Sequence, residues 1–255
     1  MIIAPLVQPK RQSVTSAAAQ RDIPPEMVYT PPVLPESWRQ GAILPVDKSK
    51  GSSSFDVVEG IRDGTGIQKV GHAGTLDPLA TGLLIVLVAR PATRLQEACA
   101  HLPKTYEATL RLGETTPSHD TETEVTERTD PTGLPPAALE GARASFVGTI
   151  NQVPPMYSAV KIDGERLYEK ARRGETVDRP PRQVRIDRFD LLEWTPPHLS
   201  VRIECSKGTY IRALARDFGE ELGVGAHLTS LRRTAIGNFG VDDSWTVAGL
   251  RDTLA

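Results

Sequence analysis

The residues best suited to chemistry lie in a short loop from Gly71 to Gly82, which carries one histidine, His72, and one aspartate, Asp77. Its three glycines and one proline impose an irregular backbone, as in loops that present functional side chains. A carboxylate held in such a loop can act as a nucleophile or a base. Two structural alternatives remain open: Asp-Pro favours the start of a turn, and a lone histidine is more often satisfied within its loop.

A second segment, Ser206–Arg212, lies between an alternating apolar strand pattern and a helical one. The start of a helix carries partial positive charge and free N–H groups, so Arg212 in the first turn adds to a site suited to a carboxylate or a phosphate. The alternative is a surface arginine paired with Asp217 or Glu204. Tyr106 and Tyr210 are candidates for stacking on a base, although most tyrosines in a chain with 5% aromatic residues belong to the core.

Other kinds of site find no support in the motifs. The five histidines and two cysteines, Cys99 and Cys205, show no metal-ligand spacing. The glycines match neither a dinucleotide-binding nor a phosphate-binding loop, and there is no Gly-x-Ser-x-Gly sequence. We therefore expect chemistry by side chains alone, with no cofactor and no metal.

Apolar periodicity around these segments predicts an α+β fold with a largely antiparallel sheet flanked by helices. Phe55, Val58 and Ile61 or Arg62 are expected on one face of a helix capped by Ser53 or Ser54. The predicted strands cover residues 42–46, 83–88, 106–112, 186–194 and 199–205. Further helices are predicted over residues 136–146, 165–173 and 211–222, the last with Thr209 as its N-cap.

Composition indicates an ordinary soluble protein, with 39% hydrophobic and 24% charged residues in 255 and no apolar stretch long enough to span a membrane. Two cysteines and no secretory signal favour a cytoplasmic location. Residues 1–40 hold seven of the 21 prolines and no sustained period, which predicts a disordered N-terminal arm. A single catalytic domain is expected over residues 41–255.

Several segments, taken in order, resemble the TruB family of pseudouridine synthases over roughly residues 41 to 250. The Gly71–Gly82 loop resembles the family's nucleophile loop almost residue for residue. The other matching segments are 46–51, 104–106 with 111–113, 152–161 with 164, 167–168 and 171–172, then 206–212, 225–228 and 231–233.

The resemblance implies the pseudouridine synthase fold and a cofactor-free isomerase, an intramolecular transferase, that converts one uridine in the T-loop of tRNA (position 55) to pseudouridine. By the same resemblance, Asp77 is the catalytic nucleophile, Tyr106 stacks on the target base and is placed to move a proton, and Arg212 pairs with the aspartate. His72, Tyr210 and Leu231 match positions that line the substrate pocket or fill the space left by the extruded base. Such a target must be flipped out of its stack, and an arginine beside the aspartate would keep the carboxylate ionised.

RNA affinity is expected to come from basic residues, because the net charge of −2 gives no attraction overall. Residues 157–188 hold nine Lys or Arg against six acids, whereas residues 114–130 hold six acids and one base. We expect Lys48, Arg172 and Arg173 to contact phosphates, although a solvated surface is the plainer interpretation of charge runs.

Only residues 246–255 follow Trp245, so the family's small C-terminal RNA-binding module is expected to be absent. The expected partner is tRNA, bound through its T-loop and stem by a monomer with no obligate protein partner. The alternatives are an RNA-guided relative acting on ribosomal RNA, a non-catalytic RNA-binding protein with the same fold, and a carboxylate-based hydrolase, which would need a second acid near Asp77.

Overall fold

The chain folds into two compact units in a computed structural model that describes residues 22–158, 160–162 and 164–254. The terminal unit comprises residues 22–107 and 231–254, and the inserted unit comprises residues 108–230. The chain passes from one unit to the other within strand β4 (Lys104–Leu112) and returns within β12 (Ala226–Ile236). A single catalytic domain was expected over residues 41–255. The division into two units leaves no signal in the sequence, because the chain changes unit inside two strands and not in a proline-rich or glycine-rich linker.

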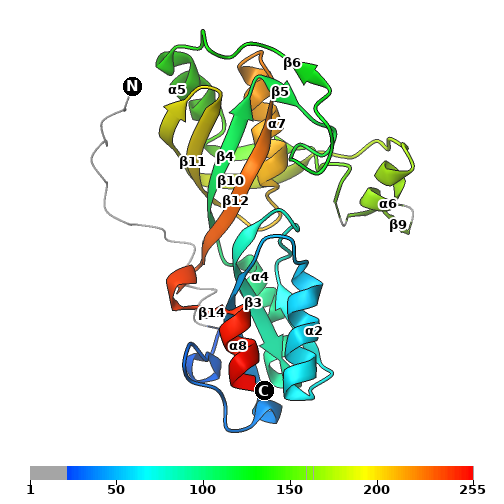
Figure 1. Ribbon diagram of the computed structural model, residues 1–255, viewed down its shortest axis with the longest axis vertical. Helices are drawn as coiled ribbons and strands as arrows, with labels where there is room; N and C mark the ends of the chain where they lie inside the picture. The colour runs from blue at the N-terminus through cyan, green and yellow to red at the C-terminus, as the bar shows by residue number, and fades with distance from the viewer. Residues whose placement is uncertain (1–21, 159, 163, 255) are drawn as a thin grey trace. The chain divides into compact units, whose positions relative to one another are not determined.

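The terminal unit is built on a mixed sheet with the strand order β14-β1-β3-β12, with β2 beside β3 and β13 beside β12. β3 pairs antiparallel with β1 and β2 and parallel with β12. Figure 1 labels its main elements. Their bounds are β1 Ala42–Lys48, α2 Ser54–Thr65, β2 Val70–Ala73, β3 Thr81–Val88, α3 Ala89–Thr93, α4 Gln96–His101, β13 Phe239–Gly240, β14 Trp245–Thr246 and α8 Val247–Leu254, with short 3-10 turns at Pro25–Met27, Trp38–Gln40 and Val241–Asp243.

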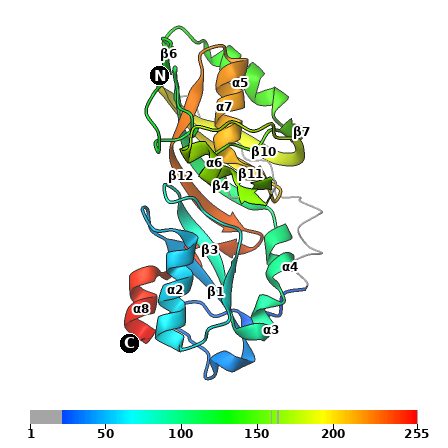
Figure 2. The same ribbon diagram turned by 90° about the vertical axis from the view of Figure 1, so that its right-hand side faces the viewer.

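Strand β3 lies at the centre of this unit with helices on both faces, α2 and α8 on one side and α3 and α4 on the other (Figure 2). Its side chains alternate between two apolar clusters: Leu84 and Val86 pack with α2 and α8, whereas Leu83 and Ile85 pack with α3 and α4. A strand covered on both faces has no polar side, so its sequence is a continuous apolar run. The predicted buried central strand is confirmed.

Helix α2 begins with two serines that do different things. Ser53 is the N-cap, and its side chain and that of Asp56 form a reciprocal capping box. Ser54 is buried in the first turn. The predicted apolar face is partly wrong, because Phe55 is 52% exposed and Val57 is buried in its place. The capping box places Ser54 and Val57 on the inner face, three positions apart.

Residues 22–40 pack against the terminal unit, in contrast to the disordered arm expected over residues 1–40; residues 1–21 lie outside the described residues. Ile23 is 5% exposed in the cluster beneath α3 and α4, and Val28 forms a bridge with Ile43 of β1. The indole N–H of Trp245 donates to the carbonyl of Tyr29 at 3.0 Å. The apolar residues of this segment are too widely spaced to form a period, but Ile23, Tyr29 and Trp38 meet apolar surfaces that the rest of the chain supplies.

The inserted unit has the strand order β12-β4-β11-β10-β7. β10 pairs antiparallel with both β11 and β7. The strands predicted over residues 186–194 and 199–205 are confirmed as parts of β10 and β11, whereas β7 was not predicted. In Figure 1, α6 and β9 stand apart from this sheet. The bounds are β5 Glu114–Thr115, β6 Glu127–Arg128, α5 Pro136–Ser145, β7 Gly148–Gln152, β8 Lys161–Ile162, β9 Glu165–Arg166, α6 Leu167–Arg172, β10 Arg182–Thr195, β11 His198–Cys205 and α7 Ile211–Glu221.

Helix α7 covers the sheet of the inserted unit through Phe218. The ring of Phe218 lies 5.6 Å from that of Phe189 in β10 and 6.0 Å from that of Phe146, which follows α5. The α+β class with a mixed, largely antiparallel sheet flanked by helices is thus confirmed. None of the helices in the described residues is long and apolar enough to cross a membrane.

Candidate active site

The loop that carries Asp77 is fixed through the backbone on both sides of the aspartate. The hydroxyl of Ser54 accepts a hydrogen bond from the Leu76 N–H at 2.9 Å and donates to the Leu76 carbonyl at 3.1 Å. On the other side, the Gly51 N–H donates to the Pro78 carbonyl at 2.8 Å. Leu76 is 3% exposed and Ser54 is 3% exposed. Gly51, in the turn before α2, and Ser54, in the first turn of α2, therefore fix the backbone on either side of Asp77.

Arg233 joins the same loop to the central strand. Its guanidinium donates from Nε to the Leu83 carbonyl at 2.6 Å and from Nη2 to the Gly74 carbonyl at 3.0 Å. The guanidinium carbon also lies 6.0 Å from the centre of the Tyr106 ring, at the outer limit of a cation–π contact. Arg233 is 1% exposed. Gly82 has φ of 100° and a Cβ there would collide with the Arg233 carbonyl oxygen, so only glycine fits where the loop enters β3.

His72 occupies the strand that leads into the loop. Burial, and then the positive charge of Arg233, lower the pKa of His72 below its usual value, which keeps the ring neutral. Its Nδ1 is buried and has no hydrogen-bond partner among the described residues. A buried ring nitrogen of this kind is available to a polar group of a ligand, so the prediction of a substrate contact keeps a physical basis.

Lys48 is fully buried at the end of β1, and its ammonium donates to the carbonyls of Ser49 at 3.0 Å and Ser52 at 2.8 Å. Burial, opposed by the negative charge of Asp77 and assisted by the positive charge of Arg233, lowers the pKa of Lys48 to about 8. These contacts hold the turn before α2. The expected phosphate contact of Lys48 stays a prediction, and its burial favours a structural role.

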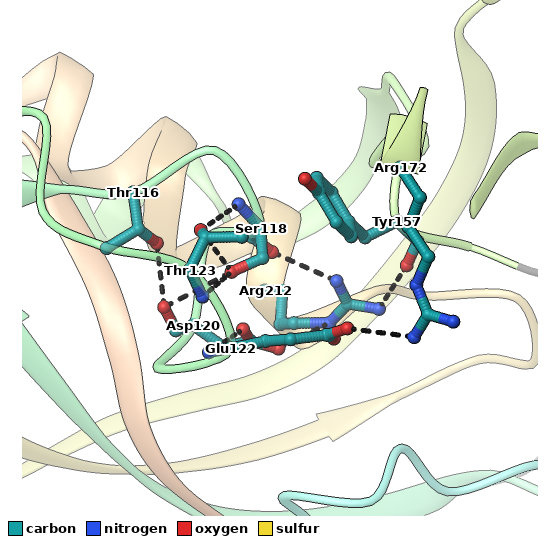
Figure 3. Close-up of polar contacts among 8 residues, drawn as sticks. All are labelled: Thr116, Ser118, Asp120, Glu122, Thr123, Tyr157, Arg172 and Arg212. Carbon is teal, nitrogen blue, oxygen red and sulfur yellow. Dashed lines mark hydrogen bonds and ion pairs between the residues drawn. The ribbon is translucent and has the colours of Figure 1, made fainter. Parts of the chain in front are cut away.

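Arg212 is held within the inserted unit by the acidic segment that follows β5. Figure 3 shows its guanidinium donating to the carbonyls of Ser118 and Tyr157, at 2.9 Å and 2.7 Å, with Nε 3.5 Å from the Asp120 carboxylate. The Arg212 side chain is 4% exposed, so it is not the surface arginine of the alternative interpretation. Asp217 pairs with Arg216 instead.

The segment around Arg212 is stiffened by its own hydrogen bonds. The Thr116 hydroxyl donates to the Asp120 carbonyl at 2.7 Å, and the hydroxyls of Ser118 and Thr123 are 2.9 Å apart. The residues between β5 and β6 showed only an excess of acids in the sequence. In the structure they are hydrogen-bonded to one another and contact the buried side chain of Arg212.

Tyr210 is the N-cap of α7, in place of the predicted Thr209, whose hydroxyl donates to Ser206. The side-chain amide of Gln152 takes both backbone groups of Tyr210: it accepts from the N–H at 2.8 Å and donates to the carbonyl at 3.1 Å. Gln152 is 2% exposed. This contact fixes the turn immediately before Arg212.

Arg172 and Arg173 are exposed at the end of α6 and are partly neutralised. Arg172 lies 3.4 Å from Glu122 and 5.6 Å from the ring centre of Tyr168. Arg173 contacts Glu165 and Glu175, each at 2.7 Å. Their contact with phosphates stays a prediction, and their acidic neighbours should reduce its strength.

The predicted site residues divide between the two units. Asp77, Tyr106, His72, Lys48 and Leu231 belong to the terminal unit, and Leu231 is buried in β12. Arg212, Tyr210, Arg172 and Arg173 belong to the inserted unit, so the expected pairing of Arg212 with Asp77 stays a prediction.

Sequence reasoning missed the supporting residues Ser54, Gln152 and Arg233 as positioning groups, although each lies in or beside a matching motif. No group of three His, Cys, Asp or Glu side chains within the described part of the chain is arranged to hold a metal ion.

Known proteins resemble this chain both in sequence and in fold. The N-terminal domain model of the TruB family pseudouridylate synthases matches residues 62–211, and the tRNA pseudouridylate synthase B C-terminal domain model matches residues 212–255. Among solved structures, a Cbf5–Nop10–Gar1 complex aligns with a TM-score of 0.65 and 29% identity over 90% of this chain and 59% of that chain. The archaeal box H/ACA sRNP Nop10–Cbf5 complex aligns with a TM-score of 0.61 and 28% identity over 84% of this chain and 53% of that chain.

Sequence relatives are more similar still. A tRNA pseudouridine synthase B from Mycobacterium sp. (strain KMS) is 49% identical over 83% of this chain and 72% of its own length. Those of Opitutus terrae and Phocaeicola vulgatus are 43% and 45% identical, over 84% and 86% of this chain and 88% and 95% of their own lengths. The fold is that of the pseudouridine synthases, which are isomerases. The chain belongs to the TruB family of pseudouridylate synthases.

The second family match bears on the expected lack of a C-terminal module. Residues 212–255, which match the C-terminal domain model, include α7 except its first residue, the whole of β12 and the elements up to α8. They divide between the inserted and terminal units, so the matched segment is not a separate compact unit. The absence of an additional RNA-binding module stays a prediction.

Proposed function

We propose that this protein isomerises uridine to pseudouridine in the T-loop of tRNA, at position 55, with Asp77 as the nucleophile. The observation that carries the proposal is the Asp77 loop, whose backbone is hydrogen-bonded on both sides of the aspartate by Ser54 and Gly51. Family membership and the tRNA pseudouridine synthase B relatives support the same reaction and the same substrate class. A carboxylate presented on a fixed backbone is suited to covalent catalysis.

The reaction can be written with atoms conserved and with no external reagent. The Asp77 carboxylate forms a bond to the nucleotide and the N1–C1′ glycosidic bond breaks. The uracil then turns so that C5 bonds to C1′, the aspartate is released, the C5 proton is lost and N1 gains a proton. Product and substrate are isomers, so no cofactor is needed.

The roles proposed for the other site residues are those that the resemblance to the TruB family implies. Tyr106 stacks on the flipped base and takes part in proton transfer, and Arg212 pairs with the Asp77 carboxylate. His72, Tyr210 and Leu231 line the pocket, and the cost of flipping the nucleotide, a few kcal/mol, is offset by stacking and phosphate contacts. Arg172 and Arg173 contribute those phosphate contacts from α6.

The test is a direct assay on an unmodified tRNA transcript labelled with tritium at C5 of uracil. We expect the purified protein to release one equivalent of tritium per tRNA without added cofactor or metal, and sequencing of the product to place pseudouridine at position 55. A transcript with cytidine at that position is the control and should release none. Release from a different uridine would overturn the T-loop assignment, and no release from any tRNA would overturn the proposed activity.

A second candidate is an RNA-guided synthase that works in a protein–RNA particle, because the aligned solved structures include an archaeal box H/ACA sRNP complex and an H/ACA RNP bound to a substrate RNA. This chain spans only 53% and 59% of two such chains, whereas it spans 72% to 95% of the tRNA enzymes at 43% to 49% identity. The stand-alone enzyme is therefore favoured. Activity on tRNA without any guide RNA or second protein separates the two candidates and also tests whether a protein partner is needed.

A further inference from the structure

Two consecutive serines at the start of α2 have different partners. The Ser53 hydroxyl accepts from the Asp56 N–H at 3.1 Å, and the Asp56 carboxylate accepts from the Ser53 N–H at 2.7 Å, so Ser53 completes the end of its own helix. The Ser54 hydroxyl reaches 22 residues along the chain and bonds both backbone groups of Leu76. Ser53 therefore caps α2, whereas Ser54 fixes the backbone of the loop that carries Asp77.

The Ser54 contact acts on the peptide adjoining the aspartate. The carbonyl of Leu76 and the N–H of Asp77 belong to one planar peptide group, so fixing that carbonyl fixes the plane from which the Asp77 residue projects. The Leu76 N–H fixes the preceding plane. Beyond the aspartate, the Asp77 carbonyl accepts from the Ala80 N–H at 3.0 Å, and the Gly51 N–H holds Pro78. Ser54 therefore supplies the side-chain contact nearest to the aspartate backbone on the N-terminal side.

We propose that Ser54 is a positioning residue for the reaction, which sets the direction of the Asp77 carboxylate through the Leu76 backbone. This inference rests on the proposed function. Covalent catalysis requires the reacting atoms to lie within a few tenths of an ångström of the productive geometry, and a displacement of about 1 Å can cost about 100-fold in rate. Both members of the Ser54–Leu76 contact are buried, so water does not replace the lost hydrogen bonds when the hydroxyl is removed.

The matched pair Ser54→Ala and Ser53→Ala tests the proposal in the full-length protein. Each variant loses one hydroxyl at the same helix end. Ser54→Ala loses two hydrogen bonds to Leu76, and Ser53→Ala loses the one that its hydroxyl accepts from the Asp56 N–H, so both should lower the melting temperature by a few degrees. Tritium release from the labelled tRNA transcript, measured well below both melting temperatures, should separate them. We expect Ser54→Ala to lower kcat at least tenfold with KM changed less than threefold, and Ser53→Ala to keep kcat within twofold of wild type.

A third variant keeps the test decisive if Ser54→Ala does not fold. Ser54→Cys has a side chain of nearly the same size that donates and accepts hydrogen bonds only weakly. Its kcat should lie between those of wild type and Ser54→Ala, with circular dichroism and melting temperature close to wild type.

Three results would overturn the inference while leaving the proposed function in place: equal kcat for Ser54→Ala and Ser53→Ala, a loss confined to KM, or wild-type kcat in Ser54→Cys. Absence of tritium release by the wild-type enzyme would instead overturn the proposed function itself.

Discussion

In the terminal unit and in the inserted unit, a buried side chain hydrogen-bonds the backbone close to a predicted functional residue. The two units differ in the further contacts around that residue. In both, one buried side chain bonds the N–H and the carbonyl of a residue just ahead of the functional one: Ser54 bonds Leu76, directly before Asp77, and Gln152 bonds Tyr210, two positions before Arg212. In the inserted unit the guanidinium of Arg212 is also bound directly, by Ser118, Tyr157 and Asp120.

This difference predicts whether Asp77 or Arg212 depends more on the side chain that hydrogen-bonds its neighbouring backbone, here called the backbone clamp: Ser54 for Asp77 and Gln152 for Arg212. Around Arg212, the backbone clamp is one of several constraints, and its loss should be absorbed by the others. Around Asp77, Ser54 bonds the residue directly before the aspartate and Gly51 bonds the residue directly after it, so a change at Ser54 should transmit to the direction of the carboxylate without an intervening residue. We therefore expect the terminal unit to be the more sensitive in catalysis, and the following experiments test that comparison.

The largest expected effect is that of Asp77→Asn. The amide keeps the shape of the side chain but cannot act as a nucleophile, so kcat should fall at least about 1,000-fold while tRNA affinity stays within a few-fold. Single-turnover tritium release and filter binding measure the two quantities on the same preparation. A kcat within tenfold of wild type would show that Asp77 is not the nucleophile. It would also contradict the expectation that catalysis is more sensitive to changes in the terminal unit.

Ile23→Ala should have the largest effect on stability. Ile23 is 5% exposed beneath α3 and α4, and truncation of such a side chain costs about 2–4 kcal/mol of unfolding free energy. Urea unfolding measures this cost. Val33→Ala is the control from the same segment, because Val33 is 60% exposed and its truncation should change the free energy by less than about 0.5 kcal/mol. Equal effects would mean that residues 22–40 add nothing to the terminal unit.

Gln152→Leu probes the clamp of the inserted unit. It removes the side-chain acceptor of the Tyr210 N–H and one donor to the Tyr210 carbonyl, which also accepts from the Leu214 N–H, and this should cost about 1–3 kcal/mol of unfolding free energy. Because Arg212 keeps its three other contacts, kcat should fall less than in Ser54→Ala. A larger loss of kcat in Gln152→Leu than in Ser54→Ala would reverse the order of sensitivity.

His119 should make the inserted unit sensitive to acid. Burial, and then the charges of Arg216 and Arg212, lower the pKa of His119 from 6.5 to about 4. Between pH 6.5 and 4 the unfolded chain binds a proton that the folded chain does not, so the free energy of unfolding falls as the pH falls through this range. After solvent screening we expect a loss of about 1–2 kcal/mol.

His119→Asn should remove this pH dependence, since asparagine tolerates the φ of 60° at this position. Urea unfolding of both proteins at pH 7 and pH 4.5 makes the measurement. An unchanged difference between the two pH values in His119→Asn would assign the acid sensitivity to other groups.

The smallest effect should come from the double change Arg172→Ala and Arg173→Ala. Both side chains are exposed and lie against carboxylates, so their removal should weaken tRNA binding only about two- to tenfold and reduce the slope of log affinity against log salt by at most about 1–2. Titration at three salt concentrations measures both. Unchanged affinity and slope would place the phosphate contacts elsewhere on the protein.

Local pattern was sufficient to predict much of the fold. The apolar run before Ala89 could only be a strand covered on both faces, and the alternation in residues 199–205 could only be a half-exposed one. The packing of Ile23, Tyr29 and Trp38 could not be predicted, because widely spaced apolar residues have no period and their burial depends on a surface assembled from distant segments.

The amino-acid sequence by itself determined which side chains are available for chemistry: a single aspartate in a glycine-constrained loop, a tyrosine on an alternating strand and an arginine at a helix start. These are properties of residue type and local spacing, which the order of the chain states directly. Only the tertiary structure decided what holds them. Ser54 reaches Leu76 across 22 positions, Gln152 reaches Tyr210 across 58 and Arg233 reaches Gly74 across 159. Hydrogen bonds between such distant residues depend on how strands and helices pack, and that information lies in no local period.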